Sequence, residues 1–152
     1  MMYQNRNFNR KGGDFGREEV GSEEIKQMIS YIENGGDELN IFRSKNGVVF
    51  KFVNKVSRDW KSKTKTSQLR KFYDELLTVR VKDKYRLMRI ELNAAYARAR
   101  NYVGEPMYDF ISEAVDKILS SDTNQGDRLE RFKHIFEAII AYNALNEGDK
   151  NE

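Results

Sequence analysis

The stretch TSQLRKFYDELL, residues 66–77, carries the pattern that decides the fold. Its large apolar side chains recur at i, i+3, i+4 and i+7, the spacing that gathers side chains on one face of an α-helix. They are Leu69, Phe72, Tyr73 and Leu76. Thr66 or Ser67 is expected to cap this helix, because a side-chain oxygen at its start can accept a backbone N–H that has no partner within the helix. The stretch therefore predicts an amphipathic helix whose apolar face is buried.

The approach to this helix is basic, because Lys61, Lys63 and Lys65 precede it at alternate positions. The exposed amide groups and the dipole of a helix N-terminus favour an anion. We therefore expect a phosphate group to bind at this entrance.

Length and composition indicate one domain in a reducing compartment. A chain of 152 residues has the length of a single domain, and the absence of cysteine excludes disulfide bonds and thiolate metal sites. The first residues lack the apolar core of a signal peptide, and no apolar run approaches the roughly 20 residues that a membrane-spanning helix needs. We expect a cytoplasmic protein with no membrane partner.

The pattern favours an all-α fold. A single proline and few alternating apolar and polar runs argue against a β-rich protein. We expect a compact bundle of about five to six helices with a disordered N-terminal tail. We expect residues 1–20 to form a mobile basic tail, residues 21–146 a single helical domain, and residues 147–152 a frayed C-terminus.

Charge is divided unevenly along the chain. Residues 55–100 hold 14 basic and 5 acidic side chains, whereas residues 101–152 hold 5 basic and 11 acidic ones. Such asymmetry is typical of a basic surface that binds a polyanion, with an acidic surface elsewhere. In the tail, Arg6, Arg10, Lys11 and Arg17 lie among aromatic residues and can add loose contacts to nucleic acid, although a mobile tail without such a role is the simpler interpretation.

Helices are also expected on the N-terminal side of the 66–77 stretch. Ser22 starts a short helix that Gly35 and Gly36 end, and residues 38–43 fit another helical turn. Residues 47–61 fit either a turn followed by a strand or a helix, and their apolar spacing favours the helix. The apolar stripes of the two longer helices are Ile25, Met28, Ile29 and Ile32, and Val49, Phe52, Val53, Val56 and Trp60.

Three more helices are expected after residue 83. The first is predicted to be the buried centre, with Met88, Leu92, Ala95 and Ala99 on one side and Tyr85, Leu87 and Ala94 widening the contact. Pro106 suits the first turn of the second, and a polar loop over residues 120–127 leads to the third. The stripes of the last two helices are Phe110, Ile111, Ala114, Val115, Ile118 and Leu119, and Phe132, Ile135, Phe136, Ile139, Ile140 and Asn143.

The residue types needed for catalysis are scarce. His134 is the single histidine and is expected to face solvent, so the chain has neither a zinc nor a di-iron ligand set. It also lacks phosphate-binding glycine loops and histidine-based triads. The acidic pair Asp74 and Glu75 fits surface ion pairs with the bases four residues earlier. We expect no enzymatic activity, no cofactor and no metal.

Three stretches resemble the small subunit of type III-A CRISPR-Cas effector complexes, the Csm complexes. They are TSQLRKFYDELL from Thr66, AYARAR from Ala95, and RFKHIFEAIIAY from Arg131, and they keep the order of the family. The chain departs from the family near Asn93, where a proline is frequent, and near Ala99, where a glycine is frequent.

The resemblance implies a non-catalytic helical subunit that self-associates into the inner filament of a ribonucleoprotein serving antiviral defence. Its partners would be guide RNA, target single-stranded RNA and other Csm subunits, and it would contact the RNA backbone without sequence specificity. The family motifs make Gln68, Arg70, Lys71, Arg98 and Arg100 candidate RNA-binding residues. The basic entrance adds Lys61, Lys63 and Lys65 to this set.

Several alternatives stay open at this point. Arg70 fits RNA binding and a salt bridge to Asp74 equally well. Tyr96 is expected to hold helix contacts rather than RNA, as are Phe136, Glu137 and Tyr142. Other function classes are a helical DNA-binding regulator, which would bind duplex DNA as a symmetric dimer, and a purely structural helical adaptor.

Overall fold

The computed structural model describes residues 22–60 and 64–151, and the side chains within 23–57 and 64–146. These residues form six helices of twelve residues or more and one short helix, α4, and none of them lies in a strand. The helices are α3 (Ser22–Asn34), α4 (Glu38–Arg43), α5 (Val48–Trp60), α6 (Thr66–Leu77), α7 (Lys84–Ala99), α8 (Glu105–Leu119) and α9 (Gln125–Asn151). The predicted all-α bundle is confirmed. The predicted tail over residues 1–20, and the candidates Lys61 and Lys63, lie outside the described residues.

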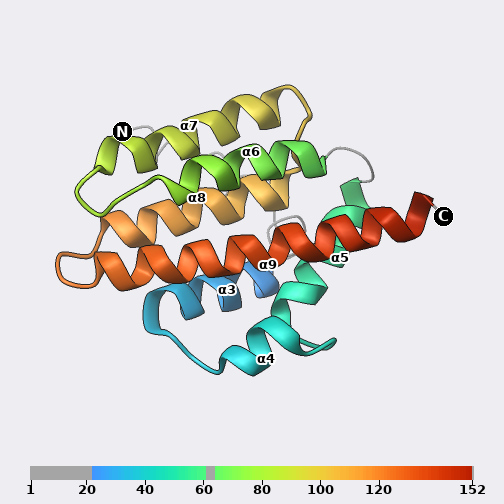
Figure 1. Ribbon diagram of the computed structural model, residues 1–152, viewed down its shortest axis with the longest axis horizontal. Coiled ribbons are helices and arrows are strands. Elements are labelled where there is room, and N and C mark those ends of the chain that lie inside the picture. Colours follow the sequence, from blue (N-terminus) through green and yellow to red (C-terminus); the bar gives the residue numbers. More distant parts are fainter. Residues whose placement is uncertain (1–21, 61–63, 152) are drawn as a thin grey trace, which may run out of the picture.

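Helix α9 runs the length of the bundle and packs against α3, α5, α6 and α8 (Figure 1). Its buried face contains the predicted apolar residues and the amide of Asn143. The Phe132 ring lies 5.7 Å from the Phe110 ring of α8 and 5.8 Å from Phe136, measured between centroids. The predicted buried face of the last helix is therefore confirmed.

Helix α3 ends where the glycine pair was expected to end it. Gly35 has a φ of 79°, and its N–H donates to the Tyr31 carbonyl at 2.7 Å. Arg131 of α9 then donates to the carbonyls of Ile32, at 2.9 Å, and of Glu33, at 3.2 Å. These bonds satisfy carbonyl groups that the last turn of a helix leaves free, and they join α3 to α9.

The stretch after Asn46 is helix α5, so the helical interpretation predicted for residues 47–61 is confirmed over Val48–Trp60, and residue 61 lies outside the described residues. Gly47 lies where α4 crowds the start of α5. A Cβ added there would lie 2.2 Å from the Asn40 carbonyl oxygen, a distance at which atoms overlap. Glycine therefore permits the tight connection between the two helices.

The buried face predicted for α7 is wrong except at Leu87 and Ala94. Leu87, Ile90, Ala94 and Ala97 are buried, whereas Met88, Leu92, Ala95, Ala99 and Tyr85 are exposed. The helix carries apolar residues on two opposite sides, so periodicity does not distinguish them. Helix α7 lies at an edge of the bundle against α6 and α8 (Figure 1), and the side that packs against them carries Leu87, Ile90, Ala94 and Ala97.

Two helix starts also differ from the prediction. The N-cap of α6 is Lys65, which makes no side-chain capping bond, rather than Thr66 or Ser67. Thr66 instead accepts a hydrogen bond at 2.8 Å from Asn143, which in turn accepts one at 3.0 Å from Ser57. Helix α9 begins at Gln125, inside the predicted loop over residues 120–127, and it continues past residue 146 to Asn151.

Candidate nucleic-acid interface

A groove of about 290 Å³ lies between α6 and the C-terminal half of α7. It brings together three of the predicted RNA-binding residues, Gln68, Lys71 and Arg100, although Arg100 is far from the other two in sequence. The residues that line it are Gln68, Lys71, Phe72, Glu75, Asn93, Tyr96, Ala97, Arg100 and Tyr102. The tertiary structure thus joins the first two stretches that resemble the Csm small subunit.

The groove has an apolar floor and a polar, aromatic rim. Phe72 and Ala97 are buried, whereas the exposed fractions of Tyr96 and Tyr102 are 69% and 39%. Lys71 and Arg100 are exposed as well. A ligand in this groove would meet cationic groups and ring faces together.

The turn after α7 places Arg100 and Tyr102. Asn101 has a φ of 63°, in the left-handed region that asparagine tolerates better than most residues. The N–H of Asn101 donates to Arg98 at 3.0 Å, and the N–H of Tyr102 donates to Ala97 at 2.8 Å. This pair of bonds is a Schellman motif, and it turns the chain back toward the start of α6.

The start of α6 is held against the same turn. The Lys65 N–H donates to the Tyr102 carbonyl at 3.1 Å, and the Gly104 N–H donates to the Thr64 hydroxyl at 2.8 Å. The Lys65 ammonium lies 5.6 Å from the centroid of the Tyr102 ring, within the range of a cation–π contact. Lys65 therefore adds a cation at the rim of the groove.

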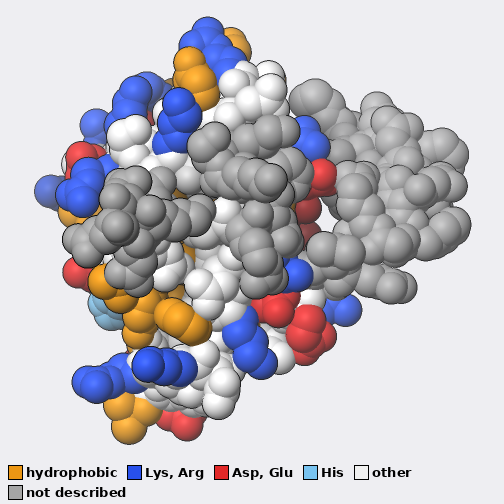
Figure 2. Space-filling model, turned by 90° about the vertical axis from the view of Figure 1, so that its right-hand side faces the viewer, with side chains coloured by type: hydrophobic (Ala, Val, Ile, Leu, Met, Phe, Trp, Pro, Cys, Tyr) orange, Lys and Arg blue, Asp and Glu red, His pale blue; other side chains and the backbone are white. Residues whose placement is uncertain are grey.

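The groove is basic overall despite one acidic residue. Glu75 accepts a hydrogen bond from Asn93 at 3.2 Å and lies 4.0 Å from the Arg89 guanidinium. Its charge is thus met from α7, whereas the ammonium of Lys71 faces solvent. Figure 2 looks at the end of the bundle where α6 begins and α7 ends, and shows Lys and Arg side chains gathered with hydrophobic ones along its upper left part.

Two tyrosines outside the groove keep their hydroxyl proton to higher pH than usual. Burial raises the pKa of Tyr73, and the charge and hydrogen bond of Glu137 raise it further. Burial likewise raises the pKa of Tyr31, together with the nearby Glu38. A phenol is neutral at physiological pH even at its ordinary pKa, and the raised pKa of Tyr31 and Tyr73 moves ionisation further away, so neither supplies charge to the site.

Arg98 lies on the other side of α7 from Arg100, because two residues along a helix turn by about 200°. Its guanidinium is 3.4 Å from a Glu105 carboxylate oxygen and 5.7 Å from the Tyr108 ring centroid. Arg98 is not among the residues that line the groove. Its RNA contact therefore stays a prediction. In the structure, Arg98 joins the end of α7 to Glu105 and Tyr108 of α8.

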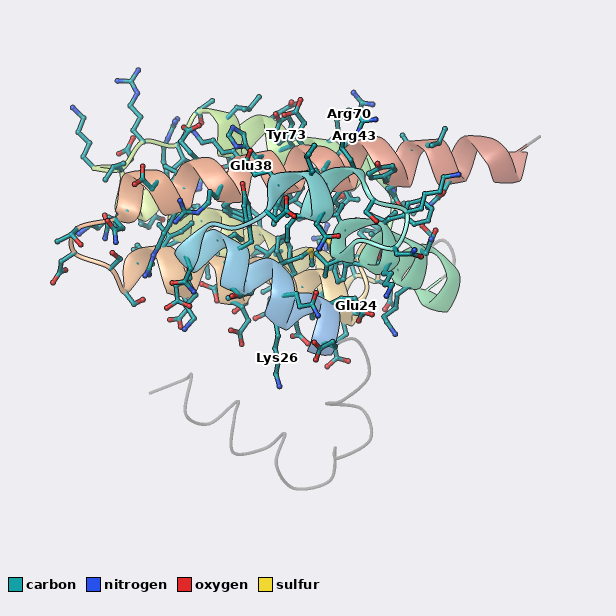
Figure 3. All side chains as sticks on the ribbon, turned by 90° about the horizontal axis from the view of Figure 1, so that it is seen from below. Glu24, Lys26, Glu38, Arg43, Arg70 and Tyr73 are labelled. Carbon is teal, nitrogen blue, oxygen red and sulfur yellow. The ribbon has the colours of Figure 1, made fainter. Side chains whose placement is uncertain are left out.

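Arg70 is exposed and also lies off the groove, standing out from the edge of the bundle in Figure 3. Within the described part of the chain, the structure shows no ion pair between Arg70 and Asp74. The salt-bridge interpretation of Arg70 is therefore not supported, and its RNA contact stays a prediction. Of the eight candidates, three line the groove and Lys65 adjoins it.

Sequence reasoning missed both tyrosines. Tyr96 was expected to make helix contacts, which is wrong, since most of its side chain is exposed. The spacing of Asn93, Tyr96 and Arg100, at i, i+3 and i+7, is a sequence signal for one helical face. Tyr102 has no comparable signal, because its position depends on the turn.

Residues 22–60 and 64–151 contain neither a metal-ligand cluster nor a helix that could span a membrane. No group of three or more His, Asp and Glu side chains there could hold a metal ion. None of the helices in that part is both long and apolar enough to cross a membrane. His134 is exposed as expected, and its Nε2 lies 3.8 Å from a Glu130 carboxylate oxygen.

Comparison with known proteins places most of the chain in a known family. The family model described as Csm2 Type III-A matches residues 22–149, which span helices α3 to α8 and nearly all of α9. Neither the curated proteins nor the solved structures include a match.

Proposed function

Because this chain belongs to the Csm2 Type III-A family and is a small subunit of a type III-A CRISPR complex, we propose that its α6–α7 groove holds the backbone of RNA. The subunit acts without catalysis of its own, in the cytoplasm, beside the guide RNA and the target single-stranded RNA. Other Csm subunits and further copies of this chain are its protein partners.

The observation that carries this proposal is the meeting of Lys71 and Arg100 in one groove with Tyr96 and Tyr102. Proteins that bind single strands combine cations that follow the phosphates with aromatic rings on which bases stack. Lys65, placed over the Tyr102 ring, extends the cationic rim toward the helix start. The groove offers both kinds of contact within one small volume.

Such contacts suit a subunit that must accept any guide sequence. Phosphate and sugar groups carry no sequence information, so binding to them does not depend on the guide. The flexible side chains of Lys71 and Arg100 neutralise phosphates, and the amide of Gln68 can donate to a phosphate or ribose oxygen. We expect little preference among RNA sequences.

One groove makes few phosphate contacts, so a single copy binds RNA weakly. Copies that stack along one strand gain from a high effective concentration, because binding of the first holds the next near its site. This favours a filament of several copies on one RNA.

The test is RNA binding by the double variant Lys71→Gln/Arg100→Gln, measured by fluorescence anisotropy at several salt concentrations. Each phosphate contact on a single strand contributes about 0.7 to the slope of log affinity against log salt. We expect weaker binding and a slope lower by about 1.4 for the two contacts.

The matched control removes two charges elsewhere. Lys26 on α3 points away from the bundle in Figure 3, and Lys45 is exposed in the turn before α5. The variant Lys26→Gln/Lys45→Gln should keep the affinity and slope of the original chain. Equal losses in both variants would contradict the groove as the site, and preference for duplex DNA of one sequence would favour the DNA-binding regulator instead.

A further inference from the structure

Helix α7 presents a second apolar face, of which only Tyr96 lines the groove. Tyr85, Met88, Leu92 and Tyr96 are 65%, 40%, 54% and 69% exposed, and they follow one another along one side of the helix. We call these four residues the α7 stripe. The buried face of α7 lies on the opposite side, against α6 and α8. A helix with apolar residues on its outer side as well is typical of a protein contact.

The α7 stripe is bordered by positive charge. Helix α7 contains four basic residues and one acidic residue, Glu91. Glu91 accepts a hydrogen bond from Ser112 at 2.7 Å and so faces α8. Lys84 borders one edge of the stripe and Arg89 the other. Two such stripes placed face to face would bring like charges together, which disfavours a symmetric contact.

The opposite side of the bundle has complementary charge. Helices α3 and α4 lie across the bundle from α7 in Figure 1 and nearest the viewer in Figure 3. Residues 22–43 contain five acidic and two basic side chains. Asp37 and Glu38 are exposed at the start of α4, and Leu39 beside them is 71% exposed. An apolar group with acidic neighbours is what a basic, apolar stripe would contact.

We propose that the α7 stripe of one copy docks on the α4 surface, Asp37 to Leu39, of a second copy. This deepens the proposed function, because it rests on the stacking of several copies and names the two faces that meet. Two different faces on opposite sides make a head-to-tail contact, which repeats into an open filament rather than closing as a dimer.

The α7–α4 contact between two copies is weak by itself, and bound RNA strengthens it. Four partly exposed side chains on their own fall short of the roughly 800 Å² that each partner of a standard interface buries. Tyr96 belongs both to the α7 stripe and to the groove, so a docked copy lies beside the RNA site. Stacking and RNA binding therefore support each other through effective concentration.

The experiment is sedimentation velocity of the full chain over a range of concentrations, alone and with a single-stranded RNA long enough for several copies. Leu92→Lys places a charge in the middle of the α7 stripe at an exposed helical position. Losing the burial of one leucine should weaken self-association about tenfold or more. Circular dichroism checks that the variant remains helical.

Charge reversal tests the choice of the second face. Lys84→Glu/Arg89→Glu on α7 should weaken self-association, and so should Glu38→Lys on α4. A mixture of these two variants should associate again, because the unchanged α7 stripe of Glu38→Lys meets the unchanged, acidic α4 surface of the other variant. Recovery in the mixture supports the α7–α4 contact.

Three results would overturn the inference. They are unchanged stacking by Leu92→Lys, stronger association of Lys84→Glu/Arg89→Glu alone, and no recovery in the mixture. RNA affinity of Leu92→Lys and Glu38→Lys, measured under conditions where the chain is monomeric, separates this inference from the proposed function. If Leu92→Lys and Glu38→Lys bound RNA normally and still stacked, only the docking faces would be wrong. If these variants lost stacking but the original chain did not bind RNA, only the RNA groove would be wrong.

Discussion

Helices α9 and α7 differ in how many neighbours cover them. Helix α9 packs against four helices and buries a long continuous face. Helix α7 packs against two helices, and its residues Leu92 and Tyr96 remain exposed to solvent. Position in the bundle thus decides which apolar residues stabilise the fold and which remain for binding. The central helix serves stability, and the edge helix joins stability on one side to recognition on the other.

The largest effect should come from the middle of α9. Phe136 is fully buried and stacks on Tyr73 at 6.3 Å between ring centroids. Phe136→Ala should lower the free energy of unfolding by about 3–5 kcal/mol, because it leaves a cavity in the buried core. Urea unfolding followed by circular dichroism measures this loss. Leu145→Ala, on the exposed side of the same helix, should cost less than about 1 kcal/mol.

The two faces of α7 should differ strongly from each other. Ile90 is fully buried and Leu92 is 54% exposed. Ile90→Ala should cost about 2–5 kcal/mol of unfolding free energy, and Leu92→Ala less than about 1 kcal/mol. Urea unfolding measures both free energies, at a protein concentration where the chain is monomeric. A larger cost for Leu92 would mean that α7 packs through the face that we assign to docking.

The smallest effect is expected at Asn101, in the turn after α7 that positions Tyr102 at the groove. Asn101→Ala should lower the free energy of unfolding by about 1 kcal/mol, because alanine is strained at a positive φ. Asn101→Gly should stay within about 0.5 kcal/mol of the original, since glycine adopts this conformation freely. Thermal unfolding compares the two. If alanine and glycine behaved alike, the left-handed turn would not be under strain, and its role in placing Tyr102 would need another account.

Most helices could be predicted because each has one apolar stripe. In α6 the residues Leu69, Phe72 and Leu76 are buried as their spacing indicates, and the last helix follows the same rule. In helix α7 the apolar spacing did not identify the buried face, because two opposite sides of the helix are both apolar. Choosing between them needs the neighbouring helices, which periodicity does not contain.

The candidate site could be predicted in part. Gln68, Lys71 and Arg100 were named from family motifs, but their meeting in one groove depends on the packing of α6 against α7. The separation of Arg98 from Arg100 follows from helical geometry alone. The place of Lys65 beside Tyr102 does not, since it depends on hydrogen bonds between segments distant in sequence.

The sequence by itself determined that this chain is helical, where most helices run, which side of most of them is buried, and which family its motifs resemble. These properties are local, because helical periodicity and end signals act over a few residues. Only the tertiary structure decided which side of α7 faces the core and that the start of α6 meets the end of α7. Those outcomes depend on helices competing for a limited core, and that competition involves contacts between residues far apart in the chain.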